Sequence, residues 1–537
     1  MIFSVFHALI SMLSFLSLLI LAIAAVQSQP ETNSHPSKEF IASKAHRMEL
    51  LLLDRELCSN LEEYIEELQS KIEVLQGFAE MIRTPLQAAK GREEEFLSNP
   101  LHSFRLIRHM HEDWRQLEKF MRQPVGKNQI KFIKEKAKEF PSKEDAEEAT
   151  EALYRIIRTY DVPGEDLFQG LIDGVRYNGS ISAIDFFSLG TLHFQWGEYD
   201  KAAQFLSFCL ELVEPEYHSV YKVLGFASSE VFLLLARCFV EMDQEEYARR
   251  TLMSHPALAE HSEPLLSLFT NTKHAKLSED LQRALPEDFN QLCRSSHQNK
   301  PSRLHCRYNA TTSPFLRLAP LRMEELSLDP YIVVYHNVLS DAEIAEIERV
   351  GEPLLIRAGL GKKNLNQKYK VRTALGAWMP DDKMDAAGWP VLHRVFRRIR
   401  DMTGLIMNDH QFLQLIKYGF GGHYDRHFDF INGSFPITQG DRMATVLFYL
   451  SDARHGGSTI FTHLKLRVPA ERGKVLFWYN MRGETHDLDT QTLHGACPVI
   501  DGTKTVLSCW IHEFDQMFIQ PTYHPGGRVF PYSATES

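Results

Sequence analysis

Three residues near the C-terminal end of the sequence have the types and spacing of a metal site. His427 and Asp429 are two residues apart, and on a β-strand this spacing directs both side chains to one face. His494 comes just before another predicted strand and offers a third ligand. Two histidines and one carboxylate form the facial triad of non-haem Fe(II) oxygenases, which leaves coordination positions open for a cosubstrate and O₂.

The His-x-Asp pattern occurs three times in the chain, so the pattern alone does not choose the ligands. His111-Glu-Asp113 lies in a helical pattern, where residues two apart point to different faces. His423-Tyr-Asp425, however, shares the strand parity of His427 and Asp429. Spacing therefore leaves both of these pairs open as ligands.

Length and composition limit what the chain can be. It has 537 residues, enough for about three domains. With 44% apolar and 24% charged residues, the composition is that of a folded protein and excludes a wholly disordered chain. A net charge of −11 argues against broad nucleic-acid binding, because a phosphate backbone requires a surplus of Lys and Arg on some face.

The first residues predict a secretory protein. Residues 1–28 contain no charged side chain and are mostly apolar before a polar stretch, which favours a signal peptide cleaved after Ser28. A retained membrane anchor is the alternative, since the apolar run has about the minimum length of a transmembrane helix. Three glycosylation sequons are compatible with the secretory route, at Asn178, Asn309 and Asn432.

Seven cysteines are present, and in an oxidising compartment some of them should be paired. Cys293 and Cys306 lie in a polar, loop-like stretch and are the predicted disulfide. Cys209 and Cys238 fall in helical patterns and are predicted to be buried thiols.

The N-terminal part of the mature chain, residues 29–140, is predicted to be helical and to dimerise. From 44 to 83, apolar residues repeat every seven positions in two registers, one containing Ile65 and Ile72 and the other Leu61 and Leu68. Such heptads favour a coiled coil. An amphipathic helix that packs within its own domain is the alternative interpretation.

Residues 141–258 resemble tetratricopeptide helix pairs. Leu189-Gly190, Phe194, Gly197, Tyr199 and Ala202 occupy the expected small and aromatic positions, and a fainter copy follows. Helix pairs of this kind bind extended peptides, and Phe194, Trp196 and Tyr199 are candidates for stacking on proline rings. The same aromatics could instead belong to the core of the domain.

The C-terminal half changes to β-structure. Residues 259–328 are irregular and polar, and are predicted to be a linker held by the disulfide. Strands are expected at 332–335, 412–418, 444–450, 474–479 and 505–511, and Ser340-Asp-Ala-Glu343 predicts a capped helix. The expected fold is multidomain α + β, with an all-α N-terminal half followed by a double-stranded β-helix, or jelly roll.

The region 411–518 resembles the catalytic domain of the collagen prolyl 4-hydroxylase alpha-subunit family, whose members are dioxygenases dependent on Fe(II) and 2-oxoglutarate. The resemblance extends more weakly over nearly the whole mature chain. The matching runs, in order, are Tyr418-Gly-x-Gly-Gly, His427-Phe-Asp429-Phe, Arg442-Met-Ala-Thr445, Leu447-Phe-Tyr-Leu-Ser-Asp452, Gly456-Gly457, Val475-Leu-Phe-Trp-Tyr-Asn480, His494-x-Ala-Cys-Pro-Val499 and Trp510-Ile-His-Glu513.

The resemblance implies roles for individual residues. It places the iron ligands at His427, Asp429 and His494, in preference to His423 and Asp425. It also assigns Lys504 to the far carboxylate of 2-oxoglutarate. Such a bond suits a buried dicarboxylate. Tyr418 is a second candidate for that carboxylate, and Trp510 a candidate for the wall of the pocket.

The chain departs from the family pattern near its C-terminus. Cys509 stands where the family has a lysine, and Thr522 stands near the cysteine that pairs with the position of Cys497 in the family. In place of the family's disulfide, the chain could pair Cys497 with Cys509.

The resemblance implies a procollagen-proline 4-dioxygenase that hydroxylates X-Pro-Gly peptides in the endoplasmic reticulum lumen, with ascorbate keeping the iron reduced. Residues 329–520 are then the catalytic domain and 521–537 a tail. Because this tail is not a retention signal, protein disulfide isomerase is expected as a beta subunit in an α₂β₂ tetramer. The alternatives are a related dioxygenase acting on another secreted Pro-rich protein, and a non-catalytic dimer that binds Pro-rich peptides.

Overall fold

The structure is a computed structural model of the chain. It describes residues 39–273, 285–294, 303–358, 371–379, 389–407, 412–431, 440–483 and 485–516, and the backbone of 522–523 and 529–530. The elements named below lie in one unit, residues 40–537. The predicted signal peptide and the sequon at Asn432 lie outside the described residues.

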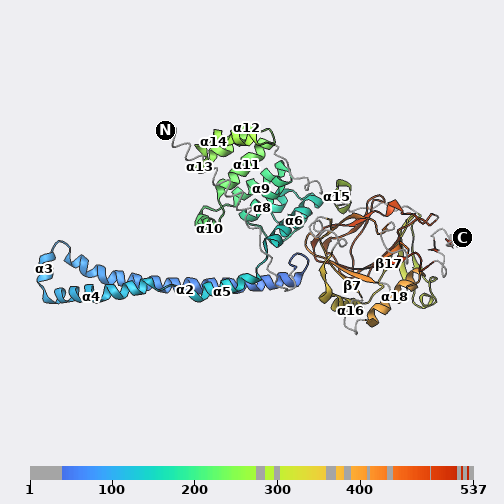
Figure 1. Cartoon of the computed structure of the whole chain (residues 1–537), viewed down its shortest axis with the longest axis horizontal. Helices are drawn as coiled ribbons and strands as arrows, with labels where there is room; N and C mark the ends of the chain where they lie inside the picture. Colours follow the sequence, from blue (N-terminus) through green and yellow to red (C-terminus); the bar gives the residue numbers. More distant parts are fainter. Residues whose placement is uncertain are drawn as a thin grey trace. The chain divides into compact units, whose positions relative to one another are not determined.

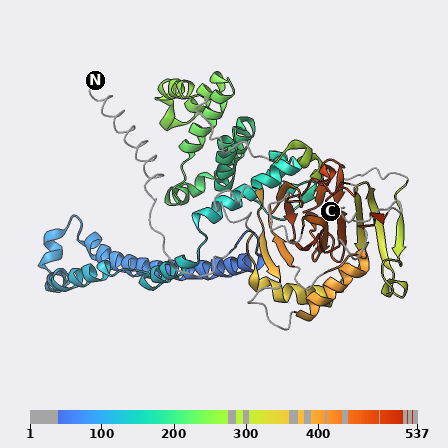
Figure 2. The ribbon, with the colours of Figure 1, turned by 45° about the vertical axis from the view of Figure 1, so that its right-hand side comes forward.

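The heptad pattern folds as one helix, α2 (Lys44–Ala89), of 46 residues. It begins at Ser43, whose side chain accepts a hydrogen bond from the His46 N–H. Figures 1 and 2 show α4 (Pro100–Arg122) and α5 (Lys127–Lys136) running beside it, with α3 (Glu93–Ser98) at the turn. The heptad residues Leu61, Ile65 and Ile72 are exposed, whereas Leu68 is half-buried, so the described part of the chain covers this seam only in part.

The next region consists of packed helices, as the sequence predicts. A capping box formed by Ser142 and Asp145 starts α6 (Lys143–Tyr160), and a second one formed by Ser182 and Asp185 starts α8 (Ala183–Gln195). α8 packs on α9 (Tyr199–Leu212), and α11 (Ser228–Glu241) packs on α12 (Glu245–Ser254). The shorter helices of this region are α7 (Gly164–Phe168), α10 (His218–Val223), α13 (Pro256–Ala259), α14 (Ser262–Asn271) and α15 (Glu287–Arg294).

The C-terminal half is built on a nine-stranded sheet in which every neighbouring pair is antiparallel. Its strands, in spatial order, are β3 (Cys306–Asn309), β4 (Leu321–Leu328), β5 (Tyr331–His336), β14 (Val475–Tyr479), β10 (Arg442–Tyr449), β17 (Lys504–His512), β8 (Leu413–Tyr418), β7 (Leu375–Met379) and β6 (Ile356–Arg357).

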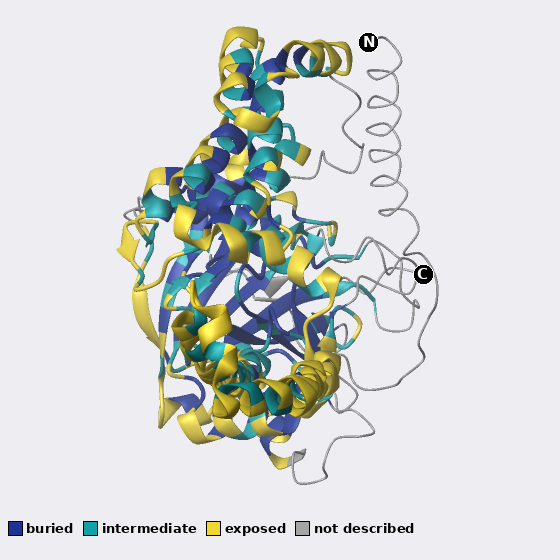
Figure 3. Ribbon diagram, turned by 90° about the vertical axis from the view of Figure 1, so that its left-hand side faces the viewer, coloured by how far each residue is buried: buried dark blue, intermediate teal, exposed yellow. Residues whose placement is uncertain are grey.

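Both faces of this sheet are buried, as Figure 3 shows by colour. Successive residues of a strand point to opposite faces, so Val333 and Val334 of β5 belong to different cores. One core lies against α16 (Asp341–Gly351) and α18 (Trp389–Thr403). The predicted capping box of Ser340 and Glu343 starts α16 with both of its hydrogen bonds.

The other face of the large sheet packs against a four-stranded antiparallel sheet. Its strands, in order, are β13 (Leu466–Val468), β12 (Thr459–Phe461), β15 (His494–Ala496) and β9 (Tyr424–His427). Tyr449 and Trp478 from the large sheet meet Phe461 from the small one in a single core. The predicted helical N-terminal half and β-rich C-terminal half are therefore confirmed.

The stretch 259–328 is more regular than the sequence indicates. Besides α14 and α15, it contains β3 and β4, which form one edge of the large sheet. The prediction of an irregular linker is therefore wrong for these elements. The sequence does not predict β4 because the consecutive Glu324 and Glu325 break the apolar alternation that identifies a strand.

Among the described helices, none has by itself both the length and the apolar character of a membrane span. The segments Pro215–Val223 and Ser228–Glu241 meet those criteria only when they are taken together, and the chain bends by 94° between them.

Candidate metal and cosubstrate site

The two histidines of the predicted triad lie on neighbouring strands of the small sheet. His427 ends β9, His494 begins β15, and the two residues are register partners. Their rings are 4.3 Å apart between centroids. Asp429 follows two residues after His427, beyond the end of β9.

The side chains of these three residues converge. One potential ligand atom from each lies within 4.8 Å of the others. The Nε2 atoms of His427 and His494 are each 3.7 Å from a different oxygen of Asp429. Two imidazole nitrogens and a carboxylate on one side of a small gap suit Fe(II) with open positions.

Hydrogen bonds to the backbone orient both rings. His427 Nδ1 lies 2.8 Å from the Asp425 carbonyl oxygen, and His494 Nδ1 lies 3.0 Å from that of Thr492. A carbonyl only accepts, so each Nδ1 carries the proton and each Nε2 keeps its lone pair for a metal. Burial, together with the neighbouring His494, lowers the pKa of His427 to about 3, so this ring is neutral near pH 7.

The carboxylate of Asp429 is also fixed by hydrogen bonds. Although burial opposes its ionisation, the pKa of Asp429 stays below its usual value, and the charge of Arg442 and the hydrogen bond from Thr445 contribute to this lowering. The Thr445 hydroxyl donates to Asp429 Oδ2 at 2.7 Å and accepts from Asn480 Nδ2 at 2.9 Å. Thr445 and Asn480 are both buried, so Asp429 is fixed by a chain of hydrogen bonds that water does not reach.

The competing pair is placed elsewhere. His423 is buried and its Nδ1 lies 2.9 Å from the Thr373 hydroxyl, while Thr373 in turn accepts from the His423 N–H at 3.1 Å. Neither His423 nor Asp425 belongs to a metal-binding group found among the described residues. The structure therefore brings together His427, Asp429 and His494, the ligands that the family resemblance implies.

Lys504 is a buried cation without an acidic partner among the described residues. Its side chain is 2% exposed, and its ammonium donates to the Thr459 hydroxyl at 3.1 Å. Burial lowers the pKa of Lys504 to about 7. A buried ammonium with one neutral acceptor is costly unless an anion completes its environment, so this position fits the far carboxylate of a dicarboxylic acid.

Tyr418 is the register partner of Lys504 on β8, and the ammonium lies 5.5 Å from its ring centroid. Burial raises the pKa of Tyr418, which keeps its hydroxyl protonated as a donor. The structure therefore brings these two predicted cosubstrate residues together.

The triad and Lys504 line the same cavity, of about 660 Å³. This volume suits a small cosubstrate together with part of a larger substrate. The remaining charged and aromatic side chains of its wall are Arg372, Trp378, Tyr418, Tyr424, Phe428, Arg442, Trp478 and Trp510. Trp510 is thus placed in the pocket wall, as predicted, with the Arg442 guanidinium 4.0 Å from its ring centroid.

Several of these wall residues were missed by sequence reasoning. Arg372 is buried, its guanidinium lies 4.7 Å from the Tyr424 ring centroid, and its Nε and one Nη have no hydrogen-bond partner among the described residues. Its position follows from an isolated bridge to Tyr424, which no spacing rule predicts. Arg442 begins the run Arg442-Met-Ala-Thr445, so the family resemblance could have identified it.

The three candidate peptide-binding aromatics do not form one surface. Phe194 and Tyr199 contact each other, with 5.3 Å between ring centroids, and the Arg237 guanidinium lies 5.4 Å from the Phe194 ring. Trp196 instead stacks on Tyr154, at 5.3 Å between centroids. All three predicted residues are half-buried.

The predicted disulfide between Cys293 and Cys306 is wrong. Cys293 is bonded to Cys497, and Cys306 is an exposed thiol at the start of the edge strand β3. Helix α15 carries Cys293 against β12 and β13 rather than toward β3. The substitute pairing of Cys497 with Cys509 is wrong as well, because Cys509 lies in the core of the opposite face of the large sheet.

The remaining predictions concern two buried cysteines and two described glycosylation sequons. Cys209 and Cys238 are buried thiols, as predicted. Asn178 is exposed, whereas Asn309 is buried and its Nδ2 donates to the Met402 carbonyl at 2.9 Å. The folded chain therefore leaves no room for a glycan on Asn309.

Comparison with known proteins finds two matching sequence families. Residues 43–174 match the family model of the prolyl 4-hydroxylase alpha-subunit N-terminal region, and residues 413–512 match that of the 2OG-Fe(II) oxygenase superfamily. A viral collagen prolyl hydroxylase from Paramecium bursaria Chlorella virus 1, solved with 2OG, aligns over 34% of this chain and 95% of its own, at 22% identity and a TM-score of 0.27.

Full-length relatives extend the match. The chain is 30% identical to prolyl 4-hydroxylase subunit alpha-2 of Gallus gallus, over 91% of this chain and 96% of the relative. It is 29% identical to subunit alpha-1 of Homo sapiens, over 92% and 96% of the two chains. The helical N-terminal region and the oxygenase region thus occur in one chain and in the same order, and the protein is a dioxygenase dependent on Fe(II) and 2-oxoglutarate that belongs to the prolyl 4-hydroxylase alpha-subunit family.

Proposed function

We propose that the protein hydroxylates proline at C4 in X-Pro-Gly peptides of the collagen type, using 2-oxoglutarate and O₂ and releasing succinate and CO₂. The observation that carries this proposal is the buried Lys504 in the same cavity as His427, Asp429 and His494. Its ammonium needs an anionic partner, and the relatives that match nine-tenths of the chain are prolyl 4-hydroxylase alpha subunits.

In this proposal His427, Asp429 and His494 hold the iron, which supplies the activation of O₂ and the oxidation of the C–H bond. Lys504, whose ammonium donates to the Thr459 hydroxyl, would bind the far carboxylate of 2-oxoglutarate, with the hydroxyl of its register partner Tyr418 as a further donor. The keto acid end would then be available to the iron. The apolar and aromatic wall keeps bulk water away from the reacting groups.

The N-terminal half is proposed to dimerise and to capture the substrate. The exposed heptad face of α2 is the candidate dimer contact within 29–140, and an apolar groove of about 410 Å³ lies between α2, α3 and α4. The paired helices of 141–258 are the candidate tetratricopeptide-like peptide-binding domain. Within it, Phe194 and Tyr199 contact each other and the helical core, and Trp196 stacks on Tyr154, so each predicted aromatic would offer a peptide only its exposed side.

We also propose that the chain works in the endoplasmic reticulum lumen, with protein disulfide isomerase as beta subunit in an α₂β₂ tetramer and with ascorbate as reductant. An oxidising compartment suits the Cys293–Cys497 disulfide. Expression with and without protein disulfide isomerase tests the partner. The proposal expects soluble, retained chain only in its presence, and equal solubility and retention in both cases contradicts it.

The activity is tested by the product formed from a (Pro-Pro-Gly)ₙ peptide. The chain co-expressed with protein disulfide isomerase is supplied with Fe(II), 2-oxoglutarate and ascorbate, and the peptide is hydrolysed and analysed for 4-hydroxyproline. The proposal expects 4-hydroxyproline in proportion to the succinate released. Succinate release without hydroxylation of this peptide, followed by hydroxylation of another Pro-rich peptide, would assign a different substrate.

A further inference from the structure

We propose that helix α15 is a clamp that positions the two histidine ligands, so that retention of iron depends on a helix outside the oxygenase region. α15 precedes the first strand of the large sheet by sequence, yet it contacts residues adjacent to both histidines. The inference rests on the proposed ligation of iron by His427 and His494. It concerns what holds these residues in place rather than which residues they are.

The strand that carries His427 is weakly supported by its own sheet. β9 is the edge strand of the small sheet, with four residues that are all only half-buried. β9 and β15 share only two register pairs, His427 with His494 and Tyr424 with Ala496, with an irregularity between them. An edge strand with so few ladder bonds opens readily unless another element covers it.

The first contact of α15 is to the residue before His427. Asp288 accepts hydrogen bonds from Arg426 Nη1 at 3.0 and 3.2 Å. The pair is partly exposed, with 57% of the Asp288 side chain and 29% of the Arg426 side chain accessible. It therefore directs the helix toward β9 and is the weakest of the three contacts.

The second contact is to the residue after His494. Phe289 is fully buried, and its ring lies against Gly495. A Cβ atom on Gly495 would stand 2.7 Å from Phe289 Cε2 and 2.9 Å from the Tyr424 carbonyl oxygen. The absence of a side chain at position 495 therefore allows the ring to press directly on the ligand-bearing strand.

The third contact is covalent. Cys293 is bonded to Cys497, which follows His494 by three residues, and the two Cα atoms are 5.7 Å apart. Both cysteines are buried and belong to the same core as Phe289 and Ile460 of β12. The bond fixes the distance between the helix and the segment that carries His494.

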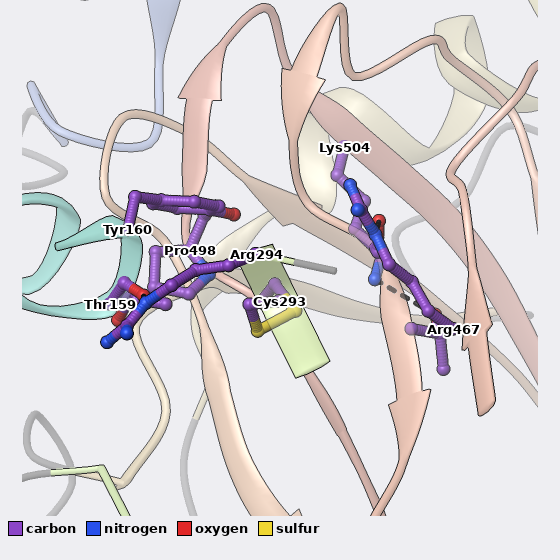
Figure 4. Close-up of a disulfide and its surroundings, with 10 residues drawn as sticks. Thr159, Tyr160, Cys293, Arg294, Arg467, Pro498 and Lys504 are labelled. Carbon is purple, nitrogen blue, oxygen red and sulfur yellow. Dashed lines mark hydrogen bonds between the residues drawn. A yellow bond between two sulfur atoms is a disulfide. The ribbon is translucent and has the colours of Figure 1, made fainter. Parts of the chain in front are cut away.

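α15 is also tied to the helical region, as Figure 4 shows for Arg294 and Thr159. Arg294 Nε donates to the Thr159 carbonyl at 2.6 Å, and a second guanidinium nitrogen donates to that of Arg158 at 3.2 Å. The Tyr160 hydroxyl donates to the Pro498 carbonyl at 2.7 Å. Because α6 holds both α15 and the residue after Cys497, the clamp has a fixed base.

The clamp is tested by the dissociation constant for Fe(II), measured by competition with a colorimetric chelator. The full-length chain co-expressed with protein disulfide isomerase is compared with Cys293→Ala/Cys497→Ala. We expect the variant to bind Fe(II) at least tenfold more weakly, as loss of outer contacts to a metal site does. At saturating Fe(II) its kcat and its KM for 2-oxoglutarate should stay within about twofold, because Lys504 is untouched. Cys306→Ala, which removes an exposed thiol, should leave every one of these constants unchanged.

A second variant tests the clamp in case the disulfide variant does not fold. Phe289→Leu keeps an apolar side chain and the disulfide but withdraws the ring from Gly495, and it should also weaken Fe(II) binding while kcat at saturating Fe(II) is kept. Unchanged Fe(II) affinity in a folded variant overturns the clamp, as does a loss of kcat with Fe(II) affinity intact. The ligand assignment is tested separately with His494→Ala. If this variant binds Fe(II) as tightly as the parent chain, the proposed ligation is wrong, whatever the clamp variants show.

Discussion

His427 and His494 face each other as register partners on two adjacent antiparallel strands, with their rings 4.3 Å apart. Strand pairing therefore creates the metal site from residues that are far apart in the sequence. Asp429 joins them because the chain bends just after β9, and Lys504 comes from a different sheet that forms the other wall of the cavity. The site consequently depends on how the two sheets pack.

The affinity for 2-oxoglutarate should fall as pH rises above about 7. The pKa of Lys504 in the free site is lowered to about 7 by burial. A bound carboxylate favours the ammonium form and raises this pKa, so binding above pH 7 requires uptake of a proton. Linkage then gives a loss of up to about tenfold in affinity per pH unit above 7, and little change just below it. The KM for 2-oxoglutarate, measured from pH 6 to 9, checks this.

Lys504→Arg is the matched control for that pH profile. A guanidinium stays charged over the whole range, so the slope above pH 7 should disappear even if the larger side chain binds 2-oxoglutarate more weakly. An equally steep profile in Lys504→Arg would assign the pH dependence to another group.

Thr445→Val should weaken Fe(II) binding by about tenfold to a hundredfold. The substitution keeps the shape of the side chain and removes the hydroxyl that donates to Asp429 and accepts from Asn480. The carboxylate then loses its fixed orientation. Thr445→Ser keeps the hydroxyl and should restore most of the affinity, measured by chelator competition. Similar affinities in the valine and serine variants would exclude this role of the hydroxyl.

Gly421→Ala should destabilise the fold by about 3 kcal/mol, combining strain at a positive φ with overpacking. Gly421 has φ +62°, and a Cβ there would lie 2.6 Å from both the Cβ and the carbonyl oxygen of Ala152 on α6. Gly174→Ala is the control, because Gly174 also has a positive φ but nothing lies within 4 Å of its Cβ position. Thermal unfolding should show a clearly larger drop in Tm for Gly421→Ala, and equal drops would mean that the contact with α6 is not stabilising.

The sequence predicts those features that local pattern determines. The apolar strands of the large sheet, the capped start of α16 and the long helix α2 all have periodicities or caps that need no knowledge of the rest of the fold. The three ligands were found because the His-x-Asp spacing marked the candidate pairs and because the family resemblance excluded His423 and Asp425.

Features that depend on docking between distant segments were not predictable in this way. The Cys293–Cys497 bond requires α15 to lie against the small sheet, and its two cysteines are 204 residues apart. Cys306 is the partner that the sequence predicts for Cys293, because only separation along the chain can be read from a sequence. Arg372 reaches the cavity through a single bridge to Tyr424, and the burial of Asn309 depends on contact with the end of α18.

The central claim is that His427, Asp429 and His494 hold the iron of a peptide-dependent dioxygenase. The most direct test measures the conversion of 2-oxoglutarate to succinate with Fe(II), ascorbate and a (Pro-Pro-Gly)ₙ peptide, for the parent chain, His494→Ala and His423→Ala. The account predicts peptide-stimulated turnover in the parent and in His423→Ala, and at least a thousandfold less in His494→Ala. Turnover that survives in His494→Ala and disappears in His423→Ala would contradict it.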